Sequence, residues 1–296
     1  GGDSMTGSIR NIKLKANDGL ELAAVLFKAE NPRALVQIIH GAVEHKNRYF
    51  DFAEFLQSNG FTVIISDNRG HGESRNDKYY LGTMGSLEQM IEDQLVITRY
   101  VKQLYPGKEL YMIGHSLGSL FARVYLQEHD HELSKLVLSG TPNYIPGVQA
   151  AYMLGKILTM LGGRRGYLLA KIKGDTKQDH SWISVSRKNL DAYINDPLCG
   201  YIYENYGLLT LIDADRQMHN FRRFKCANPD LPILSVTGED DPVTGGSKGL
   251  QDSIDSLKKV GYKNVASIVY KGMKHEVLNE DNKEEVYRDI LDFLMK

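Results

Sequence analysis

The chain has 296 residues, of which 42% are hydrophobic and 25% charged, with a formal net charge of −1. This composition is typical of a globular protein and excludes a disordered chain, while the near-zero charge argues against nucleic acid as a partner. No apolar run of about eighteen residues occurs, so we expect no membrane span. Residues 1–7 are interpreted as a tag remnant and the start of the native chain at Met5. Because no apolar signal segment follows, we expect a cytoplasmic location.

Short apolar runs rich in β-branched residues alternate with helical periodicity along the chain. The central runs are continuously apolar, which is typical of strands buried on both faces. This alternation predicts an α/β fold with a mainly parallel sheet flanked by helices. The expected strands are 9–15, 20–27, 34–39, 61–66, 109–113, 135–139, 233–236 and 266–270, and the expected helices are 51–59, 86–104, 117–128, 247–260 and 283–295.

The alternation stops between residues 141 and 230, where helical apolar spacing dominates. We interpret this segment as a helical cap or lid inserted over the carboxyl edge of the sheet, with residues 8–140 and 231–296 forming the core. Its apolar stripe is expected to pack on the sheet and line a substrate pocket. The alternative is a lid that makes transient contact with a lipid surface through the stripe and nearby basic side chains. The stripe comprises Val148, Ala151, Tyr152, Leu154, Gly155, Leu158 and Leu161, and the basic residues are Arg164, Arg165, Lys171 and Lys173.

The stretch Gly114-His115-Ser116-Leu117-Gly118 lies between an expected strand and an expected helix. A Gly-x-Ser-x-Gly pattern in this setting is typical of a nucleophile elbow, which holds the serine hydroxyl exposed at the carboxyl edge of a sheet. Gly114 and Gly118 lack a Cβ and so allow the strand and helix to approach closely. By itself the five-residue pattern is weak, and its interpretation depends on a base, an acid and an oxyanion hole.

A serine nucleophile needs a histidine to take its proton and a carboxylate to orient that histidine. His275 is the one histidine between the last expected strand and the closing helix, and we predict that it is the base. The acid should follow a late strand, where Glu239, Asp240 and Asp241 are adjacent. Asp241 is favoured because Pro242 keeps the backbone before it extended, while the other two are interpreted as solvated loop charges.

The oxyanion hole needs two main-chain N–H groups directed at the substrate carbonyl oxygen. We expect one from Leu117, directly after the nucleophile and at the start of a helix. The other should come from the loop after the third strand, where Ala42 follows Gly41.

The two cysteines, Cys199 and Cys226, are too few for a disulfide framework, and nothing near them offers metal-ligand spacing. They are interpreted as buried thiols, with a bridge between the two as the alternative. We expect no metal and no cofactor.

Five segments together resemble the branch of the α/β-hydrolase superfamily that holds monoacylglycerol lipases and bacterial lysophospholipases. The resemblance implies the α/β-hydrolase fold, with Ser116, Asp241 and His275 as a catalytic triad and Ala42 and Leu117 as oxyanion donors. It implies a structural role for Asp67 and Arg69, and it does not extend to residues 144–228. The segments are His40-Gly41-x-x-Glu44-His45-x-x-Arg48-Tyr49, residues 67–74 (DNRGHGES), the elbow, Gly238-x-x-Asp241-Pro242-Val243 and Gly272-x-x-His275-Glu276-x-x-x-Glu280.

The expected function is that of a serine carboxylic-ester hydrolase acting on small lipophilic esters through an acyl-enzyme, resembling monoacylglycerol lipase or lysophospholipase. A small-substrate carboxylesterase, a peptidase and an acyltransferase use the same triad and stay open as alternatives. A non-catalytic binding protein of this fold is disfavoured because such proteins usually lack a triad member. An epoxide hydrolase or dehalogenase is excluded because it needs Asp at the position of Ser116.

Overall fold

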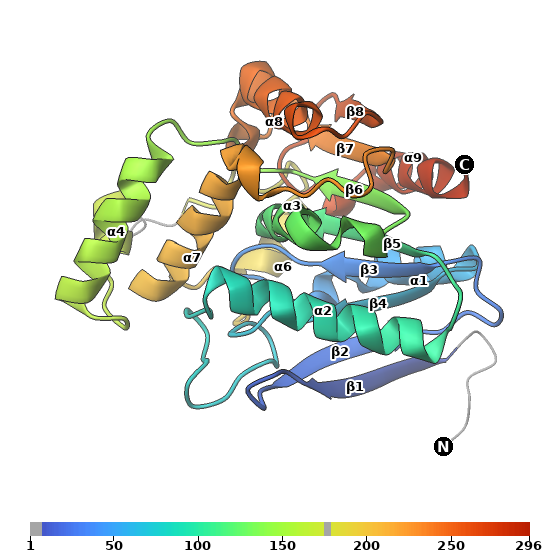
Figure 1. The fold of residues 1–296 in the computed structure, drawn as a ribbon, viewed down its shortest axis with the longest axis horizontal. Helices are drawn as coiled ribbons and strands as arrows, with labels where there is room; N and C mark the ends of the chain where they lie inside the picture. The colour runs from blue at the N-terminus through green and yellow to red at the C-terminus, as the bar shows by residue number, and fades with distance from the viewer. Residues whose placement is uncertain (1–7, 175–178) are drawn as a thin grey trace.

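A computed structural model of the protein describes residues 8–174 and 179–296 (Figure 1). The tag remnant expected at residues 1–7 lies outside the described residues. Within them, each strand and helix expected from the sequence forms, with ends that differ by at most a few residues.

Eight strands form one sheet in the order β1-β2-β4-β3-β5-β6-β7-β8. The pairs β1·β2 and β2·β4 are antiparallel and the other five pairs are parallel, so the predicted mainly parallel sheet is confirmed. The strands are β1 (Ile9–Lys15), β2 (Glu21–Phe27), β3 (Leu35–Ile39), β4 (Thr62–Ser66), β5 (Leu110–His115), β6 (Lys135–Ser139), β7 (Ile233–Gly238) and β8 (Val265–Tyr270).

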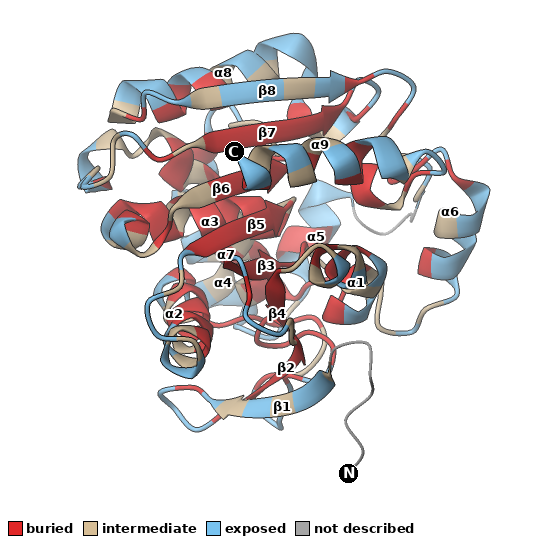
Figure 2. Cartoon of the chain, turned by 90° about the vertical axis from the view of Figure 1, so that its right-hand side faces the viewer, coloured by how far each residue is buried: buried red, intermediate tan, exposed pale blue. Residues whose placement is uncertain are grey.

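Helices cover both faces of the sheet. On one face lie α1 (Phe50–Ser58) and α9 (Lys283–Met295), whose apolar residues share a core with alternate residues of β3 such as Val36 and Ile38. On the other lie α2 (Leu87–Leu104), α3 (Leu117–His129) and α8 (Gly246–Val260), packed with Leu35 and Ile39. Every residue of β3, β4, β5 and β7 is buried, because both faces are covered, whereas β1 and β8 at the edges are largely exposed (Figure 2).

The segment between β6 and β7, residues 141–230, is called the inserted segment below. It contains the helices α4 (Val148–Gly162), α5 (Leu168–Lys173), α6 (Arg187–Ile194) and α7 (Asn205–Arg216). Helix α4 packs against α5 and α7, and α7 packs against α3 of the core. Figure 1 shows α4 and α7 beyond the carboxyl ends of the parallel strands. Across the described residues, no helix is both long enough and apolar enough to cross a bilayer.

Candidate active site

Ser116 lies in the sharp turn between β5 and α3. Its backbone has φ 54° and ψ −119°, a conformation that a residue with a side chain rarely adopts. A Cβ added at Gly114 would lie 2.4 Å from the carbonyl oxygen of Gly118, and one added at Gly118 would lie 2.2 Å from that of Ile39. Both glycines are therefore required for the strand, the turn and the helix to pack this closely.

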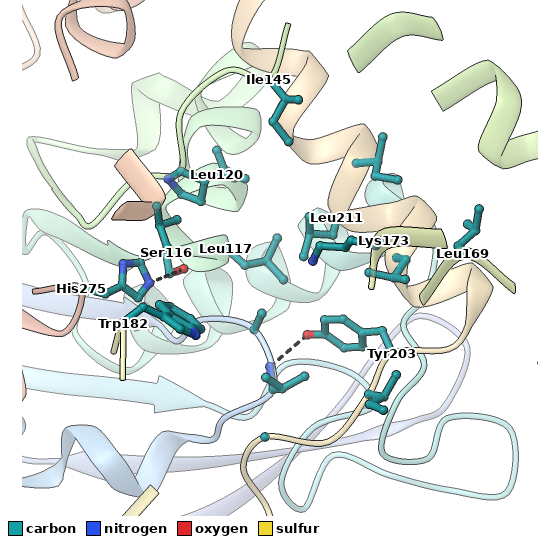
Figure 3. A pocket seen from close by; sticks show the side chains of 18 of the residues that line it. Ser116, Leu117, Leu120, Ile145, Leu169, Lys173, Trp182, Tyr203, Leu211 and His275 are labelled. Carbon is teal, nitrogen blue, oxygen red and sulfur yellow. Dashed lines mark hydrogen bonds between the residues drawn. The ribbon is translucent and has the colours of Figure 1, made fainter. Parts of the chain in front are cut away.

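Ser116, His275 and Asp241 lie in a continuous hydrogen-bonded row. Ser116 Oγ is 2.8 Å from His275 Nε2, and His275 Nδ1 is 2.8 Å from Asp241 Oδ2. His275 is 3% exposed and Asp241 2% exposed. The three residues follow β5, β8 and β7, so parallel strands bring their carboxyl ends to one edge of the sheet. Figure 3 shows Ser116 and His275 directed toward each other at the pocket wall.

The three adjacent carboxylates after β7 occupy different surroundings. Glu239 and Asp240 are exposed, while Asp241 is buried and its Oδ1 accepts a hydrogen bond from the main-chain N–H of Val243 at 2.8 Å. That bond fixes the carboxylate, which leaves Oδ2 directed at His275. The structure therefore brings Asp241 to the histidine and leaves the other two acids in solvent.

Ala42 and Leu117 line the same pocket as Ser116. None of the hydrogen bonds between described residues uses the main-chain N–H of either. Ala42 lies in the 40–49 segment, which follows β3 and approaches the elbow so closely that a Cβ on Gly41 would lie 3.1 Å from Ser116 Cβ. Two main-chain N–H groups without an acceptor among the described residues therefore lie in the lining of the pocket that holds Ser116.

The 40–49 segment is strained at Val43, a β-branched residue with φ 50°. The inserted segment holds both polar groups of this residue: Gly200 N–H donates to the Val43 carbonyl at 2.9 Å, and Val43 N–H donates to Tyr203 Oη at 3.1 Å. Tyr203 Oη also lies 2.5 Å from Nε2 of buried His71. Residues of the inserted segment thus help to hold the backbone next to Ala42.

A buried ion network connects the 40–49 segment to the loop that carries His275. Arg48 donates to both carboxylate oxygens of Glu276, at 2.7 and 2.6 Å, and to Glu44 at 2.7 Å. Glu44 in turn accepts from Gly41 N–H and from Tyr49 Oη, both at 2.6 Å. Burial alone would raise the pKa of Glu276, but the charge and hydrogen bonds of Arg48 outweigh burial and lower that pKa to about 2.

His275, the candidate base, has an uncharged aromatic neighbour. The His115 ring lies 4.8 Å from the His275 ring, centroid to centroid, and its Nδ1 is 3.0 Å from Ser139 Oγ. Burial, followed by the proximity of His275, lowers the pKa of His115 to about 4. His115 is therefore neutral at neutral pH and places no fixed positive charge beside the candidate base.

A cavity of about 690 Å³ opens at Ser116 and runs beneath the inserted segment. Its walls are predominantly apolar, and Figure 3 shows Leu211 and Leu169 extending it away from Ser116. Trp182 lies beside His275, with ring centroids 5.2 Å apart. Of the apolar stripe noted in the sequence, the residues that line the cavity are Val148, Ala151, Leu154, Gly155 and Leu158.

Sequence reasoning did not assign roles to the residues that support the site. Glu44, Arg48 and Glu276 stand in the motifs that carried the resemblance, so those motifs contained a usable signal. Tyr203 and Trp182 lie in the inserted segment, where no motif marked them. Two other assignments agree with the structure. Asp67 binds Lys46 and Arg69 binds Asp93, both braces outside the pocket. Cys199 and Cys226 are free thiols and do not form the bridge considered as the alternative, but each is only partly buried, so the expectation of buried thiols was wrong in that respect.

Comparison with known proteins gives consistent matches. Residues 30–282 match the family described as serine aminopeptidase, S33. Monoacylglycerol lipase of Mycolicibacterium smegmatis is 27% identical over 90% of this chain and 89% of its own length, and probable lysophospholipase L2 of Haemophilus influenzae is 23% identical over 95% and 87%. Among solved structures, a thermostable carboxyl esterase from Bacillus coagulans is 25% identical and superposes with a TM-score of 0.86 over 97% of this chain and 98% of its own. The resemblance and the fold expected from the sequence are confirmed.

Proposed function

This chain belongs to the serine aminopeptidase S33 family of α/β-hydrolases, and from that premise we propose that it hydrolyses monoacyl lipid esters through an acyl-enzyme on Ser116. Enzymes named lipases, lysophospholipases and esterases are its relatives, and it is a serine hydrolase of that kind. The observation that carries the proposal is the 2.8 Å contact between Ser116 Oγ and His275 Nε2 at the wall of an apolar cavity.

In the proposed first half-reaction, Ser116 Oγ attacks the ester carbonyl while His275 Nε2 takes its proton. Asp241 holds the imidazole in the required tautomer and stabilises its charged form. The N–H groups of Ala42 and Leu117 bind the developing oxyanion, and each donor of this kind contributes about 3 kcal/mol to lowering the barrier. His275 then gives its proton to the leaving alcohol, which departs and leaves the acyl group on Ser116.

In the second half-reaction, water takes the place of the alcohol. His275 removes a proton from that water, which attacks the acyl carbonyl, and the same two N–H groups bind the second oxyanion. His275 finally returns the proton to Ser116 Oγ, which frees the carboxylic acid. No group beyond those already described is needed for either half.

The cavity supports a substrate with one acyl chain. Its volume of about 690 Å³ falls in the range of sites that enclose a small ligand, about 300–1,000 Å³. Each methylene buried against such walls contributes about 0.8 kcal/mol, or roughly fourfold in specificity. We therefore expect rates to peak at one acyl length and to fall on either side.

We also propose that the inserted segment is a cap that contacts a lipid surface. One side of α4 lines the cavity, whereas Met153, Ile157, Met160 and Leu161 are exposed. Exposed Arg164 and Arg165 follow this helix, so basic and apolar groups adjoin. Five of the seven stripe residues line the cavity, which supports the interpretation of the stripe as a pocket wall. The side of α4 proposed to contact lipid is mostly a different set, since only Leu161 of these four exposed residues belongs to the stripe.

The proposal is tested by a fluorophosphonate probe combined with a substrate panel. The probe should label the wild type and should fail to label Ser116→Ala, because it reacts with an activated serine. The panel sets monoacylglycerols and lysophospholipids of varied acyl length beside short aryl esters and aminoacyl amides. We expect the long-chain monoacyl esters to give the highest kcat/KM.

Ser247→Ala, which changes an exposed serine of α8, is the matched control and should retain labelling and activity. Labelling that survives in Ser116→Ala would refute the assignment of the nucleophile. Faster cleavage of aminoacyl amides than of any ester would instead favour a peptidase with the same triad.

A further inference from the structure

Three side chains with metal-binding atoms converge beside, but outside, the catalytic pocket. His45, Asp196 and Cys199 each place one ligand atom within 4.8 Å of the other two, and within residues 8–174 and 179–296 they form the one such group. His45 belongs to the 40–49 segment, and Asp196 and Cys199 belong to the inserted segment. None of the three lines the catalytic cavity.

Asp196 and Cys199 stand at the two ends of a closed turn. Cys199 N–H donates to the Asp196 carbonyl at 3.0 Å, and Leu198 N–H donates to Asp196 Oδ1 at 2.9 Å. The second bond leaves Asp196 Oδ2 directed at His45 Nε2, which is 2.6 Å away. Two ligands separated by two residues in a turn also form half of many zinc sites. The third ligand, His45, is distant in the sequence, so the residue spacing around Cys199 did not indicate a metal site.

The donor set selects the kind of ion. Imidazole nitrogen and thiolate sulfur favour Zn²⁺ and similar ions over Mg²⁺ and Ca²⁺, which take oxygen ligands. Bonds of about 2.0–2.3 Å to a common tetrahedral centre place the ligand atoms about 3.3–3.7 Å from one another. His45 Nε2 and Asp196 Oδ2, now 2.6 Å apart, would separate by roughly an ångström, and Cys199 Sγ, within 4.8 Å of both, would approach the same centre. Such movement is small for side chains on a turn and a loop.

The surrounding charge permits a divalent ion. Arg48 is the nearby cation, and its charge is already compensated by the carboxylates of Glu44 and Glu276. Asp196 and the thiolate of Cys199 supply two negative charges to the ion. On binding, the metal displaces the thiol proton of Cys199 to solvent.

We propose that His45, Asp196 and Cys199 form a binding site for a thiophilic divalent cation such as Zn²⁺. The bound ion joins the inserted segment to the 40–49 segment, next to the contacts that Gly200 and Tyr203 make with Val43. Its expected effect is to hold the inserted segment against the core, which raises the melting temperature of the loaded protein.

Titration of the full chain with Co²⁺ tests this site, because a cobalt–thiolate bond gives a charge-transfer band that a cobalt–histidine bond lacks. We expect the band to saturate at one equivalent, to disappear on addition of Zn²⁺, and to be absent in Cys199→Ser. His45→Gln should weaken Co²⁺ binding at least tenfold. Cys226→Ser removes the other thiol of the chain and should leave the band unchanged.

Three results of the Co²⁺ titration would contradict a metal site at His45, Asp196 and Cys199. The proposal is overturned by the lack of a thiolate band in the wild type, by a band that persists in Cys199→Ser, or by one that is lost in Cys226→Ser. Near-ultraviolet circular dichroism of Cys199→Ser checks that the variant is folded, so that a lost band reports a lost ligand.

Discussion

The edge of the sheet that carries Ser116 and the inserted segment that covers it are organised in opposite ways. At the sheet edge, His275 and Asp241 are almost completely buried and each polar atom of the row has a partner. On α4 of the inserted segment, Met160 and Leu161 are each 78% exposed. The difference shows that burial and hydrogen bonding fix the positions of Ser116, His275 and Asp241. The inserted segment lacks such constraints on α4, which has apolar residues on its cavity side and on its solvent side.

This contrast assigns different tasks to the two regions. Under the proposed mechanism the core determines which bond is broken, because the hydrogen-bonded row and the elbow come from it. We expect the inserted segment to select which molecule reaches that bond, because α4, α5 and α7 supply much of the cavity wall. Substitutions in the core should therefore change turnover or folding, and substitutions in the inserted segment should change preference among substrates.

The largest expected effect is at the acid of the core. Asp241→Asn should lower kcat for a short aryl ester about 10⁴-fold, because an amide directs the wrong tautomer of His275 toward Ser116. Asp240→Asn changes the exposed neighbour and should stay within about twofold of wild type. Steady-state hydrolysis of both variants provides the measurement. A collapse in Asp240→Asn instead would show that the acid is wrongly assigned.

Low pH should destabilise the folded core, because three histidines are buried in it in their neutral form. Burial lowers the pKa values of His40 and His115 to about 4 and that of His71 to about 3. The unfolded chain binds these protons near pH 6.5, whereas the folded protein does not bind them until about pH 4. The free energy of unfolding should therefore fall as pH decreases from 6.5 toward 4, by about 1.4 kcal/mol per pH unit and group. Urea unfolding at several pH values measures this, and a constant free energy from pH 7 to 5 would contradict it.

The ion network at the boundary of the two regions gives the next effect. Arg48→Met leaves Glu44 and Glu276 buried without their cation, which should reduce the free energy of unfolding by about 3–5 kcal/mol. Lys283→Met removes a surface pair with Asp51 and should cost less than about 1 kcal/mol. Chemical denaturation of both variants compares the two pairs. Equal losses would mean that the buried network does no more than a surface salt bridge.

The core could be predicted from sequence because its signals are local. Continuous apolar runs marked the strands that are buried on both faces, and the chain order of Ser116, Asp241 and His275 matched the order of the strands they follow. The choice of Asp241 over Asp240 depended on one local restriction, the proline that follows it. Each of these features constrains a few neighbouring residues and is therefore visible without the fold.

The support of the site could not be predicted in the same way, because it consists of contacts between distant segments. Tyr203 reaches Val43, and Arg48 reaches Glu276, across long stretches of sequence. The helical spacing of the inserted segment predicted that α4 would be amphipathic. It could not predict that Leu154 would line the cavity while also being 54% exposed, because that depends on the packing of α4 against α7.

Substrate preference offers a smaller effect within the inserted segment. Leu169 is a buried residue of α5 that lines the cavity away from Ser116 (Figure 3). Leu169→Ala should move the optimum toward longer acyl chains, with a change of roughly fourfold for each added methylene near the new optimum. Leu168→Ala alters the adjacent residue, which lies outside the cavity lining, and should leave the optimum in place. A series of monoacylglycerols tests both, and an unchanged optimum in Leu169→Ala would place the end of the acyl chain elsewhere.

The smallest expected effect concerns vesicle binding by the exposed side of α4. Hydrolysis of a soluble substrate does not report on this side of the helix. Leu161→Ser should weaken binding to anionic vesicles by about fivefold, because one partly immersed leucine contributes about 1 kcal/mol. It should leave kcat/KM for a soluble aryl ester within twofold of wild type, since Leu161 does not line the cavity. Leu104→Ser changes an exposed leucine at the end of α2, outside the inserted segment, and should leave vesicle binding unaltered. Co-sedimentation with anionic and neutral vesicles separates the two variants. If the wild type does not bind anionic vesicles, the exposed side of α4 has no lipid-binding role. The inserted segment would then differ from the core in function only by forming the wall of the substrate cavity.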